Sequence, residues 1–235
     1  MTIQATTSPS ATRALDAMPL PGAGRVLAVT ARPGQESADL GGLLFAFRRT
    51  GASLSLLCLT RGENASGGDG STRLEAARPW EVQMAASILG VRQVSVASYR
   101  DGGLHHYRTA DLAERIKQAA AEYSADLILV VAPETGDIAD AAVARAAIAA
   151  ALQAGMPVAA RTRAGVSGSW LLDLGTDTET ARAIQKAAAA AHSTQAEALP
   201  ALMSQLDGLG PLESVRWLVS PGRVPVQRDT SPLGL

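Results

Sequence analysis

The sequence predicts an α/β fold, a Rossmann-like three-layer α/β/α sandwich with a mostly parallel sheet. Short apolar segments alternate along the chain with longer segments of helical periodicity, which is the pattern that βαβ units produce. The apolar run at residues 127–131 has no polar interruption, as is typical of a strand that helices cover on both faces. In such folds ligands bind at the carboxyl ends of the strands, so the loops that follow the strands are the first candidates for function.

The elements can be assigned in order from periodicity and from helix and turn signals. The first strand ends at a Pro/Gly break near residue 33, and a helical pattern follows at residues 40–47. We expect further strands at residues 53–59, 94–97, 127–131 and 170–174, and one near 215–219. We expect helices at about residues 72–89, 110–124 and 178–196, and an alanine-rich helix that ends at Ala154. The pattern does not order the remaining elements of residues 199–235.

Composition and charge narrow the class of protein. A single domain at residues 25–235 follows an N-terminal arm at residues 1–24, which is rich in Ser, Thr, Ala and Pro. The net charge of −1 argues against a nucleic-acid or anionic-membrane surface, and no apolar run is long enough to span a bilayer. The single Cys58 lies in an apolar run and is interpreted as a core strand residue in a reducing compartment. We therefore expect a cytoplasmic protein, with a homo-oligomer left open.

The loop after the first strand carries a distinctive motif. It reads Ala31-Arg32-Pro33-Gly34-Gln35-Glu36, and the glycine pair Gly41-Gly42 follows it. This segment resembles the first signature of the LmbE/PIG-L family, the zinc-dependent de-N-acetylases of GlcNAc-phosphatidylinositol and related N-acetylated sugars. Family members read Ala-His-Pro-Asp-Asp-Glu at this place. The frame of the motif is kept, whereas Arg32, Gly34 and Gln35 stand where the family has the histidine and the two aspartates.

Further segments in the family's order extend the resemblance over about residues 25–195. They are Thr60-Arg61-Gly62-Glu63, Leu89-Gly90-Val91, Asp101-Gly102 and the pair His192 and Gln195, with Arg73 and residues 75–77 where the family has an Arg/Glu-bearing helix start. The family's second metal motif, Gly-His-Pro-Asp-His, aligns with Gly136, Asp137, Ile138, Ala139 and Asp140. The order and spacing of these segments imply the family's fold.

The resemblance implies a zinc cofactor, but the residues at the metal positions are unsuited to it. The family's ligand positions correspond to Arg32, Gln35 and Asp140, and its general base corresponds to Gly34. A guanidinium stays protonated and has no free lone pair, a glutamine offers only a weak neutral carbonyl, and glycine offers no base. A catalytic zinc site needs about three protein ligands and one open position. We therefore expect no zinc or other metal cofactor.

The replacements suggest that an organic cation stands in for the metal. We predict that Arg32 occupies the vacated position and pairs with Asp140, Asp137 or Glu36, because a guanidinium forms two-pronged hydrogen bonds to a carboxylate. The alternative is that Arg32 is a solvated loop residue. The ligand pocket is expected between the loops after the first and fourth strands, and its predicted residues are Arg32, Gln35, Glu36, Arg73, Asp101, Asp137 and Asp140.

Several of these residues have a simpler explanation that stays open. Arg73 could form a salt bridge on the helix surface with Glu75 or Glu81, and Asp101 could serve the turn at Asp-Gly. His105, the third catalytic candidate beside Asp137 and Asp140, could be solvated in its loop. His192 is expected to have a structural role at a helix end.

The functional prediction is a de-N-acetylase homologue that has lost the zinc site and zinc hydrolysis. It would bind a small polar, sugar-like or natural-product ligand, serve a partner protein, or carry out a metal-free reaction. One alternative is a working deacetylase with an atypical metal site. Another is a metal-free acid/base enzyme that uses Asp137, Asp140 or His105, with a closed pocket and a strongly shifted carboxylate. A pure partner role would instead leave an apolar surface patch.

Overall fold

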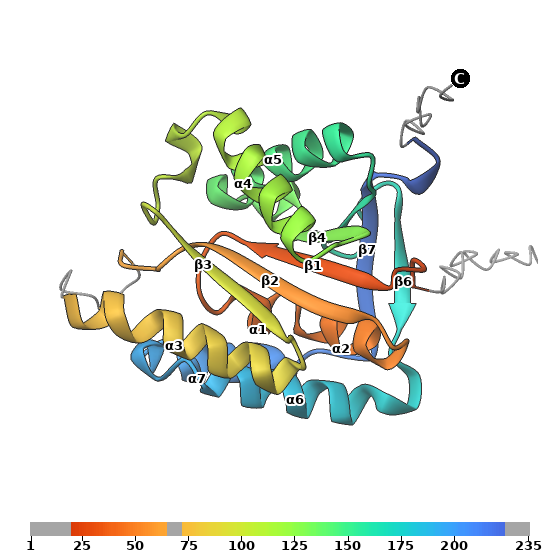
Figure 1. Cartoon of the computed structure of the whole chain (residues 1–235). Helices are drawn as coiled ribbons and strands as arrows, with labels where there is room; N and C mark the ends of the chain where they lie inside the picture. The colour runs from red at the N-terminus through yellow and green to blue at the C-terminus, as the bar shows by residue number, and fades with distance from the viewer. Residues whose placement is uncertain (1–19, 65–71, 224–235) are drawn as a thin grey trace, which may run out of the picture.

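The structure is a computed structural model that describes residues 20–64 and 72–223, with the backbone alone for residues 72–76. Its described part contains one seven-stranded sheet in the order β3-β2-β1-β4-β5-β7-β6, and β1 to β5 run parallel (Figure 1). The predicted fold class, an α/β sandwich with a mostly parallel sheet, is confirmed. The strands are β1 Arg25–Thr30, β2 Ser53–Thr60, β3 Gln93–Tyr99, β4 Leu127–Val131, β5 Val158–Arg161, β6 Ser169–Asp173 and β7 Leu212–Val219.

Helices cover both faces of the sheet. Helices α4 and α5 lie on one face, and α1, α2, α3, α6 and α7 lie on the other, as Figure 1 shows. The α-helices are α1 Gln35–Ala38, α2 Gly41–Arg49, α3 Thr72–Leu89, α4 Thr109–Glu122, α5 Ile138–Ala154, α6 Thr178–Ala190 and α7 Leu199–Asp207. Short 3₁₀ turns are η1 Leu104–His106, η2 Pro133–Thr135, η3 Gly175–Asp177, η4 Ser193–Gln195 and η5 Pro221–Arg223.

The strands are apolar throughout because each contributes to two cores. Successive side chains of a strand point to opposite faces of the sheet. Leu27 and Val29 therefore pack under α4 and α5, whereas Val26 and Ala28 pack against α2 and α3. Cys58 belongs to the second core, as predicted, and burial raises the pKa of its thiol to about 12. The thiol is therefore held in its protonated, unreactive form.

One strand of the second half, β5, was not expected from the sequence. β5 has only the four residues Val-Ala-Ala-Arg, and its strand form depends on pairing with β4 and β7 on its two sides. β7, expected near residues 215–219, runs antiparallel to β5 and β6. The helix expected to reach residue 196 ends at Ala190, and η4 follows it. These elements place the end of β5 beside the loop after β4.

Some expectations fall outside the described residues or are tested only in part. Most of the predicted N-terminal arm, and the glycine-rich loop at residues 65–71, lie outside the described part of the chain. Within residues 20–64 and 72–223, none of the helices combines the length and the apolar composition that crossing a bilayer requires.

The end of α4 gives a first testable prediction. Ser124 is the one non-glycine residue with positive φ in the described part of the chain, at 51° just after the helix. Because a side chain strains this left-handed conformation, Ser124→Gly is expected to raise the free energy of unfolding by about 0.5 kcal/mol. Ser87→Gly, the same change inside the exposed face of α3, is expected to lower it by about 0.5 kcal/mol. Urea denaturation measures the change in the free energy of unfolding for both variants. A lower value for Ser124→Gly than for wild type would contradict the prediction.

Candidate functional site

The loop after β1 is shaped by the side chain of Gln35. Gly34 precedes α1 with φ at 96°, a left-handed conformation that glycine adopts without strain. The Gln35 Oε1 atom then accepts hydrogen bonds from the backbone N–H groups of Ala31, at 2.9 Å, and Arg32, at 3.3 Å. These bonds orient the amide, so its nitrogen points away from the loop. The Nε2 atom donates to Asp140 Oδ1 at 2.7 Å.

The loop after β4 brings two aspartates to this place. Asp137 is the N-cap of α5 and accepts a hydrogen bond from the Ala139 N–H at 2.7 Å through Oδ1. Its other oxygen forms an ion pair with Arg32. Asp140 is buried, and besides the Gln35 amide it accepts the Thr135 hydroxyl at 3.0 Å. The predicted pairing of Arg32 with an acid of this loop is present, and the partner is Asp137.

Glu36 lies beneath the loop instead of lining a ligand pocket. Its carboxylate is completely enclosed and lies 2.5 Å from His192 Nε2, while the Gly34 N–H donates to its Oε2 atom at 2.9 Å. The prediction that Glu36 contacts a ligand is corrected here, because an enclosed side chain cannot reach one. His192, at the end of α6, has the structural role that was expected at a helix end.

Three other predicted site residues lie elsewhere or remain undescribed. Asp101 accepts hydrogen bonds from the backbone N–H groups of Gly102, at 3.0 Å, and Asn64, at 3.3 Å, so it closes its own turn and joins it to the loop after β2. His105 is exposed on η1, and its ring is tilted by 43° to that of His106, with centroids 3.8 Å apart. The side chain of Arg73 is outside the described residues. The loops of β1 and β4 therefore carry the candidate site.

The structure adds Asp39 and Arg161, which the sequence patterns did not reveal. Asp39 follows α1, and Arg161 ends β5 beside β4. Arg161 Nη1 lies 3.7 Å from Asp39 Oδ1, and its Nε lies 3.9 Å from Glu213 Oε2. Burial raises the pKa of the Asp39 carboxyl, and Asp140 acts in the same direction, whereas the arginines Arg161 and Arg32 oppose the rise. The sequence patterns did not predict β5, so they could not place Arg161 at the carboxyl edge of the sheet.

Two buried charged side chains of α3, Arg78 and Glu81, contact the η4 turn that follows α6. The guanidinium of Arg78 is fully buried, and its Nε donates to Thr194 Oγ1 at 3.4 Å, while its terminal nitrogens have no hydrogen-bond partner among the described residues. Glu81, one helical turn later, accepts from the Thr194 backbone N–H and hydroxyl and from the Ser193 hydroxyl, each at 2.7 Å. The sequence patterns did not single out Arg78, and they indicated Glu81 only as a partner for Arg73.

The residues present do not fit a catalytic zinc ion. Arg32 offers no lone pair, and the Gln35 oxygen is already used by two backbone N–H groups. Asp140 is held by two organic donors. No group of three or more His, Cys, Asp or Glu side chains arranged for a metal ion occurs in residues 20–64 and 72–223 whose side chains are described. The chemistry of this donor set is that of hydrogen bonds and ion pairs.

Fold and loops define an α/β sandwich with a mostly parallel sheet and a polar site in the loops after β1 and β4. The chain belongs to the GlcNAc-PI de-N-acetylase (PIG-L) family, whose model matches residues 27–152. It is 31% identical over 113 residues to a probable N-acetyl-alpha-D-glucosaminyl L-malate deacetylase 2 of Bacillus anthracis, a match that covers 46% of this chain and 50% of the relative. The chain thus spans about half the length of this curated relative.

Solved structures share the fold at low sequence identity. The N,N'-diacetylchitobiose deacetylase of Pyrococcus horikoshii is 16% identical with a TM-score of 0.62, and the match covers 90% of this chain and 89% of that one. The 4-carboxy-2-hydroxymuconate hydratase of Pseudomonas putida is 17% identical with a TM-score of 0.61, over 83% of this chain and 96% of that one. A deacetylase and a hydratase therefore share this fold, so function has to be inferred from the residues of the site.

Proposed function

We propose that this chain binds a polar, sugar-like ligand at the carboxyl edge of the sheet without zinc-dependent hydrolysis. Family membership supports the ligand class, because the B. anthracis relative is named for an N-acetylglucosaminyl substrate. The observation that carries the loss of zinc chemistry is the state of Asp140. It is the one carboxylate at the family's ligand positions, and the Gln35 amide and the Thr135 hydroxyl hold both of its oxygens.

Zinc would have to displace an organic cation as well as those donors. Arg32 is paired with Asp137 at the same edge, and its side chain is 38% exposed. A divalent ion at this place would lie against the guanidinium, which is electrostatically unfavourable. With no metal to activate water and with Gly34 in place of the base, amide hydrolysis lacks both of the groups that it uses in zinc enzymes. Guanidinium, amide and carboxylate groups can still form hydrogen bonds with sugar hydroxyls.

Restoring the ligands provides the test. Purified wild-type protein, dialysed against zinc, is expected to hold far less than one equivalent and to leave an N-acetylglucosaminyl malate conjugate intact. The triple variant Arg32→His, Gln35→Asp, Asp140→His is expected to hold roughly one zinc per chain, because two imidazoles and a carboxylate form a normal three-ligand set. Metal analysis by mass spectrometry measures the content of both proteins.

A matched variant controls for adventitious binding. Arg163→His, Gln153→Asp and Asp173→His make the same three changes at exposed positions that do not share a loop. This variant is expected to hold no more zinc than wild type. Stoichiometric zinc together with turnover by the wild-type protein would show a working deacetylase with an atypical site and would overturn the proposal.

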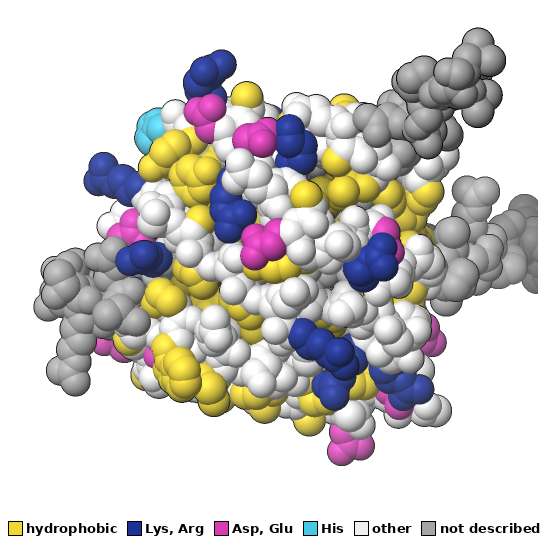
Figure 2. Space-filling model, viewed as in Figure 1, with side chains coloured by type: hydrophobic (Ala, Val, Ile, Leu, Met, Phe, Trp, Pro, Cys, Tyr) yellow, Lys and Arg dark blue, Asp and Glu magenta, His cyan; other side chains and the backbone are white. Residues whose placement is uncertain are grey.

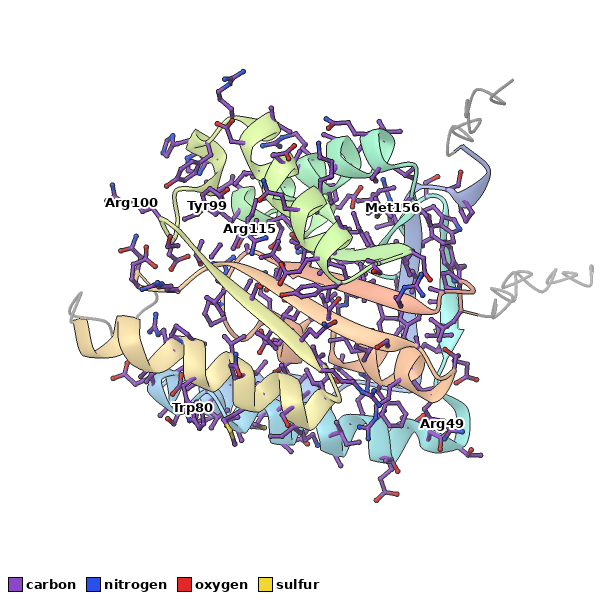
Figure 3. The ribbon with its side chains drawn as sticks, in the orientation of Figure 1. Arg49, Trp80, Tyr99, Arg100, Arg115 and Met156 are labelled. Atoms are coloured by element: carbon purple, nitrogen blue, oxygen red, sulfur yellow. The ribbon has the colours of Figure 1, made fainter. Side chains whose placement is uncertain are left out.

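A partner role is the second candidate, and an exposed apolar patch on α3 favours it. Trp80 is 67% exposed and Met84, one turn later, is 43% exposed. Figure 3 shows Trp80 on the outer side of α3, and Figure 2 shows hydrophobic side chains gathered over this lower left part of the surface. Patches of this kind commonly mark protein contacts. If no amino or N-acetyl sugar binds the wild-type protein, this role replaces ligand binding as the proposal.

A further inference from the structure

Asp39 differs from the other acids of the site in that its oxygens remain available. Its side chain is 28% exposed, and neither oxygen accepts a hydrogen bond from a side chain or backbone group in the described part of the chain. The nearest cation, Arg161, lies 3.7 Å away, beyond hydrogen-bond distance, and is shared with Glu213. By contrast, Asp137 and Asp140 have both of their oxygens engaged by groups of the protein.

The positive charges near the Asp39 carboxylate do not fully offset the unfavourable effects of burial and of neighbouring negative charges. Burial raises its pKa, and the negative charges of Asp140 on α5 and Glu36 on α1 act in the same direction. Arg161 on β5 and Arg32 in the loop after β1 lower the pKa but do not cancel the rise. An ionised carboxylate in this state is stabilised by any cationic group that a ligand brings within hydrogen-bond distance.

We propose that Asp39 binds the ammonium group of an amino sugar, so that the site selects the free amine over the N-acetylated form. This inference rests on the proposed sugar-like ligand and specifies its class. A protonated amine donates charge-assisted hydrogen bonds to a carboxylate, whereas an acetamide is neutral and donates a single N–H.

Binding of two sugars that differ only at nitrogen tests the inference. Methyl glucosaminide and methyl N-acetylglucosaminide would be titrated by calorimetry into the full-length wild-type protein, Asp39→Asn and Asp173→Asn. Wild type is expected to bind the amine about tenfold more tightly, which corresponds to one charge-assisted hydrogen bond. Asp39→Asn is expected to bind both sugars equally, and Asp173→Asn, which changes an exposed carboxylate on β6, is expected to keep the wild-type ratio.

The pH dependence gives a readout that needs no variant. The amine requires an ionised Asp39, so its affinity is expected to fall as the pH is lowered through the raised pKa of this carboxyl. The affinity for the acetylated sugar should change much less over the same range. Equal binding of both sugars by wild type, or tighter binding of the acetylated one, would overturn the inference and leave the proposed function standing. Binding of neither sugar would overturn the proposed function itself.

Discussion

Replacing Glu213 by leucine is expected to lower the free energy of unfolding by about 3–5 kcal/mol, because it leaves a buried cation without its counter-ion. The side chains of Arg182 and Glu213 are only 7% and 5% exposed, and Nη1 lies 2.6 Å from Oε1. Arg161 also loses a carboxylate at 3.9 Å in this variant. Urea denaturation followed by circular dichroism measures the loss.

The double variant Arg182→Met, Glu213→Leu separates the pair from its surroundings. Removing both charges leaves no ion stranded in the core, so the double variant is expected to be more stable than Glu213→Leu alone. If Glu213→Leu lowered the free energy of unfolding by less than about 1 kcal/mol, the range of an exposed ion pair, the prediction would be wrong. The ion pair is also connected to the site. Arg182 Nη1 donates a hydrogen bond to Gln185 Oε1 at 2.8 Å, and Gln185 Nε2 donates to the carbonyl oxygen of Ser37 in α1 at 2.8 Å.

Replacing Glu36 by alanine is expected to cost about 3 kcal/mol or more and to loosen the loop that carries Arg32 and Gln35. The substitution removes the enclosed partner of His192 and the acceptor of the Gly34 N–H. The loop would then lose the contact that ties its first turn to the end of α6. Denaturation measures the stability, and the NMR signals of the Ala31 and Arg32 amides report the loop, because both donate to Gln35.

Glu36→Gln is the matched control for the charge. Glutamine keeps an acceptor for the Gly34 N–H and nearly the same volume, so its loss is expected to be smaller than that of alanine. If alanine and glutamine had equal effects, the charge of Glu36 and not its hydrogen bonds would hold the loop. If neither changed the Ala31 and Arg32 amides, Glu36 would have no positioning role.

Both predictions concern residues at positions to which the resemblance assigns neither a metal ligand nor a base. The β1 loop keeps the glycine pair and the glutamate of the motif that it resembles, and Arg32, Gly34 and Gln35 stand where the resemblance implies a histidine and two aspartates. In the structure these retained residues make close contacts with other elements of the fold. Glu36 binds His192, and a Cβ on Gly42 would lie 2.1 Å from Glu213 Oε1. The framework of the site and its chemistry therefore depend on different residues of one short segment.

The sequence indicated more of the framework than of the chemistry. Apolar runs and glycine breaks predicted β1 to β4 and the helices between them, because burial on both faces of a sheet leaves a continuous apolar pattern. The prediction that Arg32 pairs with Asp140, Asp137 or Glu36 followed from the family resemblance together with charge, and Asp137 is the partner in the structure. β5 escaped detection since Val-Ala-Ala-Arg has little strand preference of its own, and with it the place of Arg161.

By itself the sequence determined the α/β class, since this depends on local pattern. It also predicted a site in the loops after β1 and β4, with Arg32 and Gln35 at positions where the family resemblance implies metal ligands. Only the tertiary structure decided which partners these residues take. In the folded chain Glu36 is buried in contact with His192, and Asp140 accepts a hydrogen bond from Gln35. The oxygens of Asp39 remain available beside Arg161. The physical reason is that burial and the distance between charges are set by segments far apart in the chain, which no local pattern records.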